Sequence, residues 1–243
     1  MKRTIIIVSV ILAFVLGLTG CDNGNTPSDE YKSKPIVCFG DSLTEGFGAT
    51  TPFFVDIKNS YPAFLQKKVI AEIVNAGISG DTSTGALARL DKDVLSYDPR
   101  AVVILLGAND FFWQRPAGDT KADLQLIIDK LNDGTRKIYF ASFIGDSDWE
   151  ETAIKSFELY ASLLGLESYL ELPALIPDYR KMLSELILEN DDIEYIADIW
   201  TGIWGVSKNM SDPIHPNATG YKMMADLIFN EMRPFLEVNN LIR

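Results

Sequence analysis

The sequence predicts a single α/β domain, a three-layer αβα sandwich whose helices cover both faces of a central, mainly parallel five-stranded sheet. The first observation is an alternation: short apolar runs, each ended by small polar residues, are separated by longer amphipathic stretches. The second is composition, because 243 residues with 47% hydrophobic and 23% charged side chains suit one globular domain and exclude a disordered chain. The third is the lack of an internal period, which excludes a repeat array.

Five apolar runs are expected to form the strands. The run 101–106 is continuously apolar, which is typical of a central parallel strand that is covered on both faces. The run 35–39 ends at Gly40, and the run 193–196 is the weakest. The predicted strands are 35–39, 73–74, 101–106, 138–143 and 193–196.

Four stretches carry apolar residues three and four positions apart, which is the spacing of an amphipathic helix. The first begins at Ser60-Tyr61-Pro62, a typical helix start, and the last follows Pro216. The predicted apolar faces are Phe64, Leu65 and Val69; Leu87, Leu90 and Val94; Leu124, Ile127, Ile128 and Leu131; and Tyr221, Met224, Leu227, Ile228 and Met232.

Charge and rare residue types exclude several functions. Lys and Arg number 22 against 34 Asp and Glu, and the net charge of -12 makes nucleic acid an unsuitable partner, because phosphate binding needs clustered cations. Two cysteines cannot build a disulfide scaffold. The single histidine excludes a zinc site made of several imidazoles, so no metal is expected.

The N-terminus has the pattern of a bacterial export signal. Lys2 and Arg3 precede an apolar run, 5–18, that is short for a membrane span of about 20 residues and fits the core of a signal peptide. The run leads into the segment LTGC at 18–21, which resembles the lipobox of bacterial lipoproteins. That resemblance implies cleavage before Cys21 and a diacylglyceryl group on its sulfur. An ordinary signal peptide or an uncleaved anchor is the alternative.

These features divide the chain into a signal peptide at 1–20, a lipidated polar tether at 21–33 and a globular domain at 34–243. The lipid is expected to hold the domain on an extracytoplasmic membrane surface without spanning it, which makes the membrane a partner. The tether is rich in Asn, Gly, Pro and Ser, as linkers are. With Cys21 acylated, Cys38 lacks a disulfide partner and is expected to be a buried thiol.

Four polar blocks stand where predicted strands end or where the last helix begins. Ligands of parallel α/β sheets bind beyond the carboxyl ends of the strands, near the point where the strand order reverses. These blocks are therefore candidates for a functional site. They are Gly40-Asp41-Ser42-Leu43, the segment NAGISGDT at 75–82, Gly107-Ala108-Asn109-Asp110 and Asp212-Pro213-Ile214-His215-Pro216.

The residue types in these blocks suit nucleophilic catalysis. Ser42 needs a base to take its proton, and His215 is the only imidazole in the chain that can do so near neutral pH. Asp212 stands three residues before His215, close enough to reach the imidazole and stabilise its charged form. The chain has no G-x-S-x-G segment, which excludes the nucleophile elbow of the α/β-hydrolases.

In their order and placement, the four blocks resemble those of the GDSL or SGNH hydrolases over roughly residues 34–234. The resemblance implies a flavodoxin-like fold and a catalytic triad of Ser42, Asp212 and His215. It also implies an oxyanion hole formed by the backbone N–H groups of Ser42 and Gly80 and by the side-chain amide of Asn109. It implies neither a metal nor an organic cofactor.

A serine in such a block has an alternative interpretation as a helix cap. The segment SLTE at 42–45 fits the S-x-x-E capping box. A second GDS at 145–147 also leads into S-x-x-E, but no oxyanion or base block belongs with it. We therefore interpret Ser147 as a cap and Ser42 as the nucleophile.

Two segments call for an explanation beyond these blocks. The segment 146–172 lies between the fourth strand and the next helix, where compact members of the family have a short loop. It is expected to form either an amphipathic helical pair packed on the domain or a lid over the acyl site. Phe111-Phe112-Trp113 directly follows the third block. Core packing explains part of this cluster, and we expect it to wall an apolar pocket for an acyl or aryl group.

The sequence therefore predicts a membrane-tethered serine ester hydrolase that works through an acyl-Ser42 intermediate on a small-molecule acyl ester or lysophospholipid. The 75–82 block looks like that of small esterases and thioesterases that also act on lysophospholipids. The expected substrates, in order of preference, are lysophospholipids, aryl or short acyl esters, and acetylated glycans. The alternatives are a carbohydrate O-acetyl esterase, a non-catalytic lipid- or glycan-binding lipoprotein, and an acyltransferase.

Overall fold

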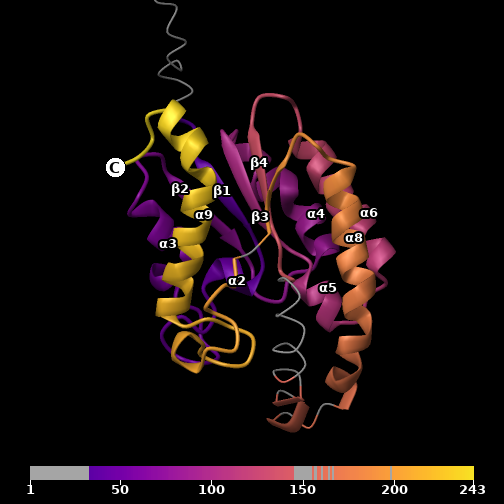
Figure 1. Ribbon diagram of the computed structural model, residues 1–243. Coiled ribbons are helices and arrows are strands. Elements are labelled where there is room, and N and C mark those ends of the chain that lie inside the picture. Colours follow the sequence, from indigo (N-terminus) through magenta and orange to yellow (C-terminus); the bar gives the residue numbers. More distant parts are fainter. Residues whose placement is uncertain are drawn as a thin grey trace, which may run out of the picture.

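In the described part of the chain, a parallel five-stranded sheet runs through the middle of the domain (Figure 1). The computed structural model describes residues 33–144, 155, 158–159, 161–163, 165, 167–197 and 199–243. The strand order is β2-β1-β3-β4-β5, and each neighbouring pair is parallel, so the predicted fold class is confirmed. The strands are β1 (Ile36–Gly40), β2 (Ile73–Gly77), β3 (Ala101–Leu105), β4 (Lys137–Ala141) and β5 (Glu194–Ile196).

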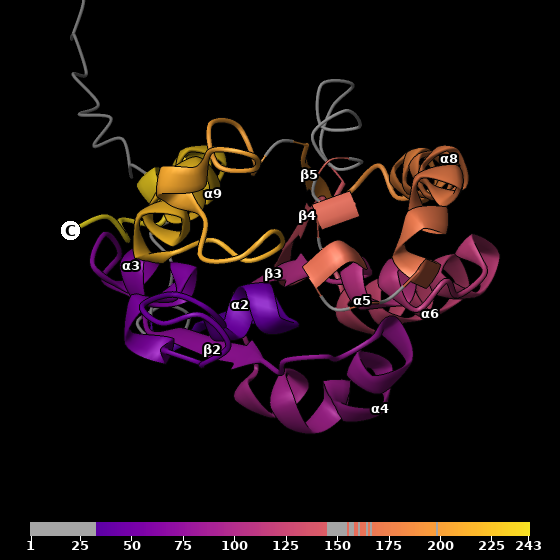
Figure 2. The same ribbon diagram turned by 90° about the horizontal axis from the view of Figure 1, so that it is seen from below.

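Helices cover both faces of the sheet. The α-helices are α2 (Ser42–Glu45), α3 (Tyr61–Gln66), α4 (Ser83–Asp93), α5 (Ala108–Phe112), α6 (Ala117–Leu131), α8 (Ile176–Leu188) and α9 (Ala218–Val238). Helices α3 and α9 pack together on one face, and α4, α6 and α8 lie side by side on the other (Figure 2). Within the described residues, no helix has both the length and the apolar character to cross a membrane.

Short 3₁₀ helices connect several of these elements. They are η1 (Ile57–Asn59), η2 (Leu95–Tyr97), η3 (Glu167–Leu175) and η4 (Ser207–Asn209).

Helix α3 is shorter than the sequence pattern predicts. It ends at Gln66, so Val69 lies beyond it and forms an isolated bridge with Ile242. The physical reason is the Gln66 amide, which donates to the carbonyl groups of Val69 and Ala71 and accepts from the Ile73 N–H. These bonds turn the chain into β2 before another helical turn can form.

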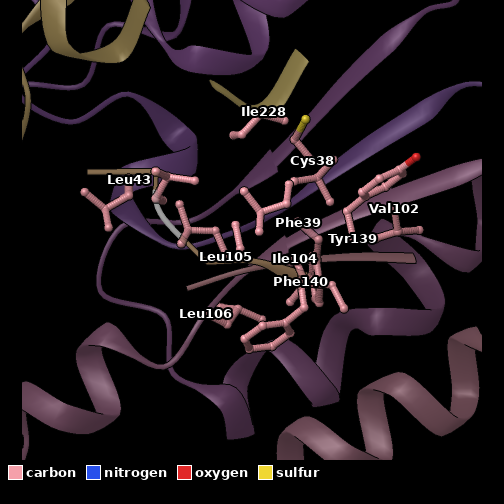
Figure 3. Packing of buried hydrophobic residues seen from close by; sticks show 14 of the residues in the cluster. Cys38, Phe39, Leu43, Val102, Ile104, Leu105, Leu106, Tyr139, Phe140 and Ile228 are labelled. Carbon is pink, nitrogen blue, oxygen red and sulfur yellow. The ribbon is translucent and has the colours of Figure 1, made fainter. Parts of the chain in front are cut away.

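Strands β1 and β3 form the centre of the core. Every residue of both strands is buried, which explains why the sequence of β3 is an unbroken apolar run. Phe39, Ile104 and Phe140 lie close together, and Cys38 lies next to Ile228 of α9 (Figure 3). Cys38 is a free and buried thiol as predicted, and burial raises its pKa to about 12.

Side-chain caps fix where helices α3, α4 and α9 begin. Ser60 caps α3, Thr82 caps α4 and Asn217 caps α9, each through a side-chain oxygen that accepts from backbone N–H groups of the first turn. Thr82 is the last residue of the 75–82 block and Asn217 follows the block that ends at Pro216. The caps therefore hold both polar blocks at the ends of the helices.

Several sequence predictions fall outside the described residues. They are the signal peptide at 1–20, nearly all of the tether at 21–33, the lipidation site Cys21 and the cap Ser147. The segment 146–172 is described only in part: Ala161 and Leu172 are buried, and η3 leads from the end of this segment into α8.

The packing of α2 on β2 leaves no room for a side chain at Gly77. A Cβ atom there would lie 2.3 Å from the backbone nitrogen of Glu45 and 2.7 Å from the carbonyl carbon of Thr44. Backbone atoms cannot move aside as a flexible side chain can. The position of α2, and of Ser42 at its start, therefore depends on this glycine.

Gly77→Ala is expected to lower the free energy of unfolding by about 1–3 kcal/mol, because α2 must shift away from the sheet. The measurement is urea unfolding followed by tryptophan fluorescence. Gly118→Ala in α6 is the matched control, since a Cβ atom there meets nothing within 4 Å. The control should be neutral or stabilise by up to ~1 kcal/mol, and equal losses in both variants would contradict the argument.

Candidate active site

The polar blocks predicted from the sequence meet at the carboxyl edge of the sheet. Ser42 begins α2 directly after β1, and Asn109 lies in α5 directly after β3. Gly80 follows β2, and His215 precedes α9. Because the strand order reverses between β1 and β3, these residues surround the switch point where ligands of such sheets bind.

Ser42 is the first residue of α2 and not its cap. The cap is Asp41, whose carboxylate accepts from the Leu43 N–H at 2.9 Å. The capping-box interpretation of Ser42 is therefore wrong, and the Glu45 carboxylate that such a box would use binds the loop after β2 instead. The Ser42 hydroxyl is free to face the imidazole, and its Oγ lies 3.1 Å from His215 Nε2.

The other ring nitrogen of His215 faces the carboxylate of Asp212. The distances from Nδ1 to Oδ2 and Oδ1 are 2.8 Å and 3.0 Å. Asp212 Oδ1 also accepts from the backbone N–H groups of Ile214 and His215, both at 2.8 Å. Burial raises the pKa of Asp212, but these hydrogen bonds outweigh burial and hold the pKa below its usual range. Asp212 is thus an ionised acceptor behind the imidazole.

The loop that carries His215 is braced by neighbouring groups. The Ser211 N–H donates to the His215 carbonyl at 2.8 Å, and the ring of Phe47 packs on the imidazole with 4.6 Å between centroids. The Tyr221 hydroxyl donates to the Phe47 carbonyl at 2.7 Å. Sequence reasoning placed Tyr221 only on an apolar helix face and missed Phe47. The signal for Tyr221 is its hydroxyl, which needs a hydrogen-bond partner when it is buried.

Two backbone N–H groups at this edge of the sheet, those of Ser42 and Gly80, are available as donors. In the described part of the chain, no group accepts from the N–H of Ser42 or of Gly80. Gly80 has a φ of +80° and an exposed position, and a Cβ atom there would meet nothing within 4 Å. The glycine is therefore needed for its backbone conformation rather than for lack of space.

The third expected oxyanion donor, Asn109, already has acceptors. Its Nδ2 donates to the Asp81 carbonyl at 2.8 Å and to Asp41 Oδ2 at 3.3 Å. An amide nitrogen carries two hydrogens, so both are engaged in this state. The bond to Asp81 places Asn109 beside the Gly80 loop. An anion bound there would have to replace the longer bond, the one to Asp41.

Asp41 is a buried carboxyl group beneath the nucleophile. Its side chain has almost no exposed surface. Burial raises the pKa of Asp41 to about 7; the hydrogen bond from the Leu43 N–H lowers it, while the charges of Asp81 and Asp110 raise it further. The position of Asp41 between the cap of α2 and Asn109 makes its charge part of the electrostatics of the site.

Two spaces open beside the nucleophile and its base. A narrow apolar crevice with a volume of about 10 Å³, room for about one water molecule, begins at Leu43 and Ile214, the neighbours of Ser42 and His215. A wide groove of about 680 Å³ lies beyond it, next to Asp212 and Pro213. The crevice is lined by Leu43, Ala108, Phe111, Phe112, Phe143, Trp200, Trp204 and Ile214.

The expected aromatic wall is present only in part. Phe111 and Phe112 line the crevice, and Phe111 also packs into the core against Tyr179, with ring centroids 5.2 Å apart. Trp113 does not line the crevice: α5 ends at Phe112, and Trp113 is 76% exposed. The placement of Trp113 in an acyl pocket stays a prediction. Trp200 and Trp204 contribute instead, and no local sequence pattern singled them out.

Among the described residues, no cluster of three or more His, Cys, Asp or Glu side chains could hold a metal ion. What the arrangement can do follows from its hydrogen bonds. A hydroxyl next to an imidazole, with a carboxylate behind it and open N–H donors beside it, is suited to nucleophilic acyl transfer.

The comparisons with known proteins agree with this class of site. Residues 38–223 match the model of the GDSL-like Lipase/Acylhydrolase family, so the chain belongs to that family. Esterase TesA of Pseudomonas aeruginosa is 24% identical over 225 residues, which cover 90% of this chain and 98% of that protein. Thioesterase 1/protease 1/lysophospholipase L1 of Escherichia coli is 24% identical over 203 residues, which cover 83% and 84%.

A solved structure supports the fold. The crystal structure of TesA superimposes with a TM-score of 0.63 at 22% identity, and the match covers 83% of this chain and 99% of that chain. Together with the family match, these relatives show that the chain is a carboxylic ester hydrolase that cleaves acyl esters.

Asp41 is expected to make the stability of the fold depend on pH. Its folded pKa of about 7 lies above the ordinary value, so the folded state binds the proton more tightly than the unfolded chain. The contribution of Asp41 to stability is therefore full below about pH 4 and is lost as the pH rises toward 7. The Asp41→Asn variant does not lose this contribution. Its free energy of unfolding relative to wild type should therefore rise by roughly 2–4 kcal/mol between pH 4 and pH 7.

Thermal unfolding between pH 4 and pH 8 measures this difference. Asp56→Asn is the control, because hydrogen bonds from Asn59 and Thr50 lower the pKa of Asp56, so its contribution to stability is lost only below about pH 4 and its gap to wild type should stay nearly constant from pH 5 to pH 8. A gap in Tm between Asp41→Asn and wild type that is the same at every pH would contradict the expectation.

Proposed function

We propose that Ser42 is the nucleophile of this ester hydrolase and that His215 and Asp212 activate it. The observation that carries the proposal is the hydrogen-bonded chain from Asp212 through His215 to the Ser42 hydroxyl, with steps of 2.8 Å and 3.1 Å. As Ser42 Oγ attacks the ester carbonyl carbon, His215 Nε2 takes its proton. The ionised Asp212 accepts from Nδ1–H, which sets the tautomer and stabilises the imidazolium.

The open donors beside Ser42 stabilise the negative charge that develops on the carbonyl oxygen. The N–H groups of Ser42 and Gly80 have no competing acceptor among the described residues, so they are available without reorganisation. Asn109 becomes the third donor when its long bond to Asp41 gives way to the oxyanion.

The cycle then closes in three proton transfers. The bond between the carbonyl carbon and the alcohol oxygen breaks, and His215 Nε2 returns its proton to the leaving alcohol. A water molecule attacks the acyl carbon while His215 Nε2 takes a proton from it. The bond between the acyl carbon and Ser42 Oγ then breaks, His215 Nε2 returns this proton to Oγ, and the carboxylic acid is released.

The geometry supports esters with a small acyl part. The crevice next to Ser42 holds about one water molecule, so an acetyl or aryl ester fits without rearrangement and a long chain does not. Aryl acetates, short acyl esters and acetylated glycans are therefore the preferred substrates. The sequence alone places lysophospholipids first among the expected substrates. With the narrow crevice they become the second candidate, and they are kept because of the proposed membrane tether.

We also propose that the chain is a lipoprotein. The support is the sequence alone: a basic start, an apolar run at 5–18 and the LTGC segment at 18–21. A diacylglyceryl group on Cys21 attaches the domain to an extracytoplasmic membrane surface. There it meets membrane lipids and esters outside the cell membrane rather than acyl-CoA.

Ser42→Ala is expected to lower kcat/KM for p-nitrophenyl acetate by about 10⁴-fold or more, because the nucleophile is lost. Asp212→Asn should lower it by roughly 10³–10⁴-fold, because the imidazole loses its orienting acceptor. The assay uses p-nitrophenyl esters from acetyl to dodecanoyl.

Ser147→Ala is the matched control, since it removes the serine of the second GDS, and it should leave the activity close to wild type. Full activity in Ser42→Ala would contradict the mechanism. A wild type that is inert on every ester would favour the lipid- or glycan-binding lipoprotein. An optimum at dodecanoyl would restore lysophospholipids to first place.

Cys21→Ser is expected to abolish lipid attachment and to move the protein out of the membrane fraction. Labelling of cells with radioactive palmitate, followed by fractionation, measures both effects. Cys38→Ala is the matched control, because Cys38 is buried in β1 and cannot reach an acylating enzyme. Labelled protein in the Cys21→Ser variant would contradict the lipoprotein proposal.

A further inference from the structure

Trp204 stands between the crevice and the groove. Among the described residues that line the two spaces, it alone belongs to both. Leu43 and Ile214, the chain neighbours of Ser42 and His215, line the crevice together with Trp204, and Trp204 also lines the groove. The indole therefore belongs to a wall that the two spaces share.

The indole is held in this position by a second tryptophan. The rings of Trp200 and Trp204 meet edge to face, with centroids 4.7 Å apart and an interplanar angle of 74°. Trp200 is buried, and its Nε1–H donates to the Ser142 carbonyl at 3.2 Å. Trp204 thus packs against Trp200, which is hydrogen-bonded to the residue that follows β4.

The backbone on both sides of Trp204 is shaped for a tight turn. Gly202 and Gly205 have φ values of +71° and +72°, in the left-handed region that glycine adopts without strain. Ile203 between them is fully buried and anchors the turn. Trp204 is half-buried, so its side chain can be exchanged without removing this anchor.

The apolar crevice suits the acyl part of the substrate. Leu43 follows Ser42, whose Oγ attacks the ester carbonyl carbon, Ile214 precedes His215, and all the residues that line the crevice are apolar. An acyl chain that extends from the carbonyl into the crevice meets Trp204 at once, because the space before it holds about one water molecule.

We propose that Trp204 is the residue that limits acyl chain length in this enzyme. The inference rests on the proposed function of Ser42 and His215. The groove behind Trp204 has a volume of about 680 Å³, within the range of small-molecule sites, and Leu159, Val206 and Met210 give it apolar walls. Without the indole, crevice and groove form one channel that accepts a longer chain.

The test compares kcat/KM for p-nitrophenyl decanoate and p-nitrophenyl acetate in the full chain. In Trp204→Ala, the ratio of decanoate to acetate should rise at least about tenfold over wild type, which is the scale of one or two accommodated methylenes. Trp113→Ala is the matched control, because this tryptophan is 76% exposed and lies outside the crevice, and its ratio should not change.

Trp204→Leu keeps the test valid if circular dichroism shows that the alanine variant fails to fold. A folded Trp204 variant with the wild-type ratio overturns the inference while the proposed function stands. An equal rise in Trp113→Ala also overturns it, because the effect would then not depend on the crevice. A wild type without ester hydrolysis overturns the inference and the proposed function together.

Discussion

The pairing of β1 with both β2 and β3 is the constraint on which the site depends. The register places Gly40 opposite Gly77 on one side and opposite Leu105 on the other, so the three strands end at one level. Each is followed at once by a polar block. Sheet hydrogen bonds therefore bring Ser42, the Gly80 loop and Asn109 to one edge, and the bond from Asn109 to the Asp81 carbonyl then joins two of the blocks. Because β1 and β3 are buried throughout, the register cannot slip without loss of the core.

His215 reaches this edge from a distant part of the chain and packs against the loop that follows Ser42. A Cβ atom on Gly48 would lie 3.2 Å from the Cβ of His215, so the two loops touch through a glycine. The Ala218 N–H at the start of α9 donates to the Ala49 carbonyl at 2.6 Å, and Tyr221 reaches Phe47 from the same helix. The distance between Ser42 Oγ and the imidazole is therefore set by how α9 docks.

The sheet and the helices α4, α6 and α9 could be predicted because their signals are local: an unbroken apolar run for β3, a 3.6-residue period for α9. Ser42 and His215 could be found because the chain has one histidine and the blocks follow strands. The role of Asp41 as the cap of α2 was not predicted, since both Asp41 and Ser42 can accept from the same first turn. Trp113 and Trp204 show the limit most clearly. Their places depend on where α5 ends and how the turn at Gly202 and Gly205 folds, which neighbouring residues do not reveal.

Ser42 and His215, the proposed nucleophile and base, are 173 positions apart, one after the first described strand and the other before the last helix. A ribosome therefore releases Ser42 long before His215, and a chain still in synthesis lacks its base. The proposed triad assembles only when α9 has docked on α3, one of the last steps that the order of synthesis permits. If the proposed triad is the catalytic one, activity requires the whole domain, and a truncated product that has lost α9 is expected to be inert rather than partly active.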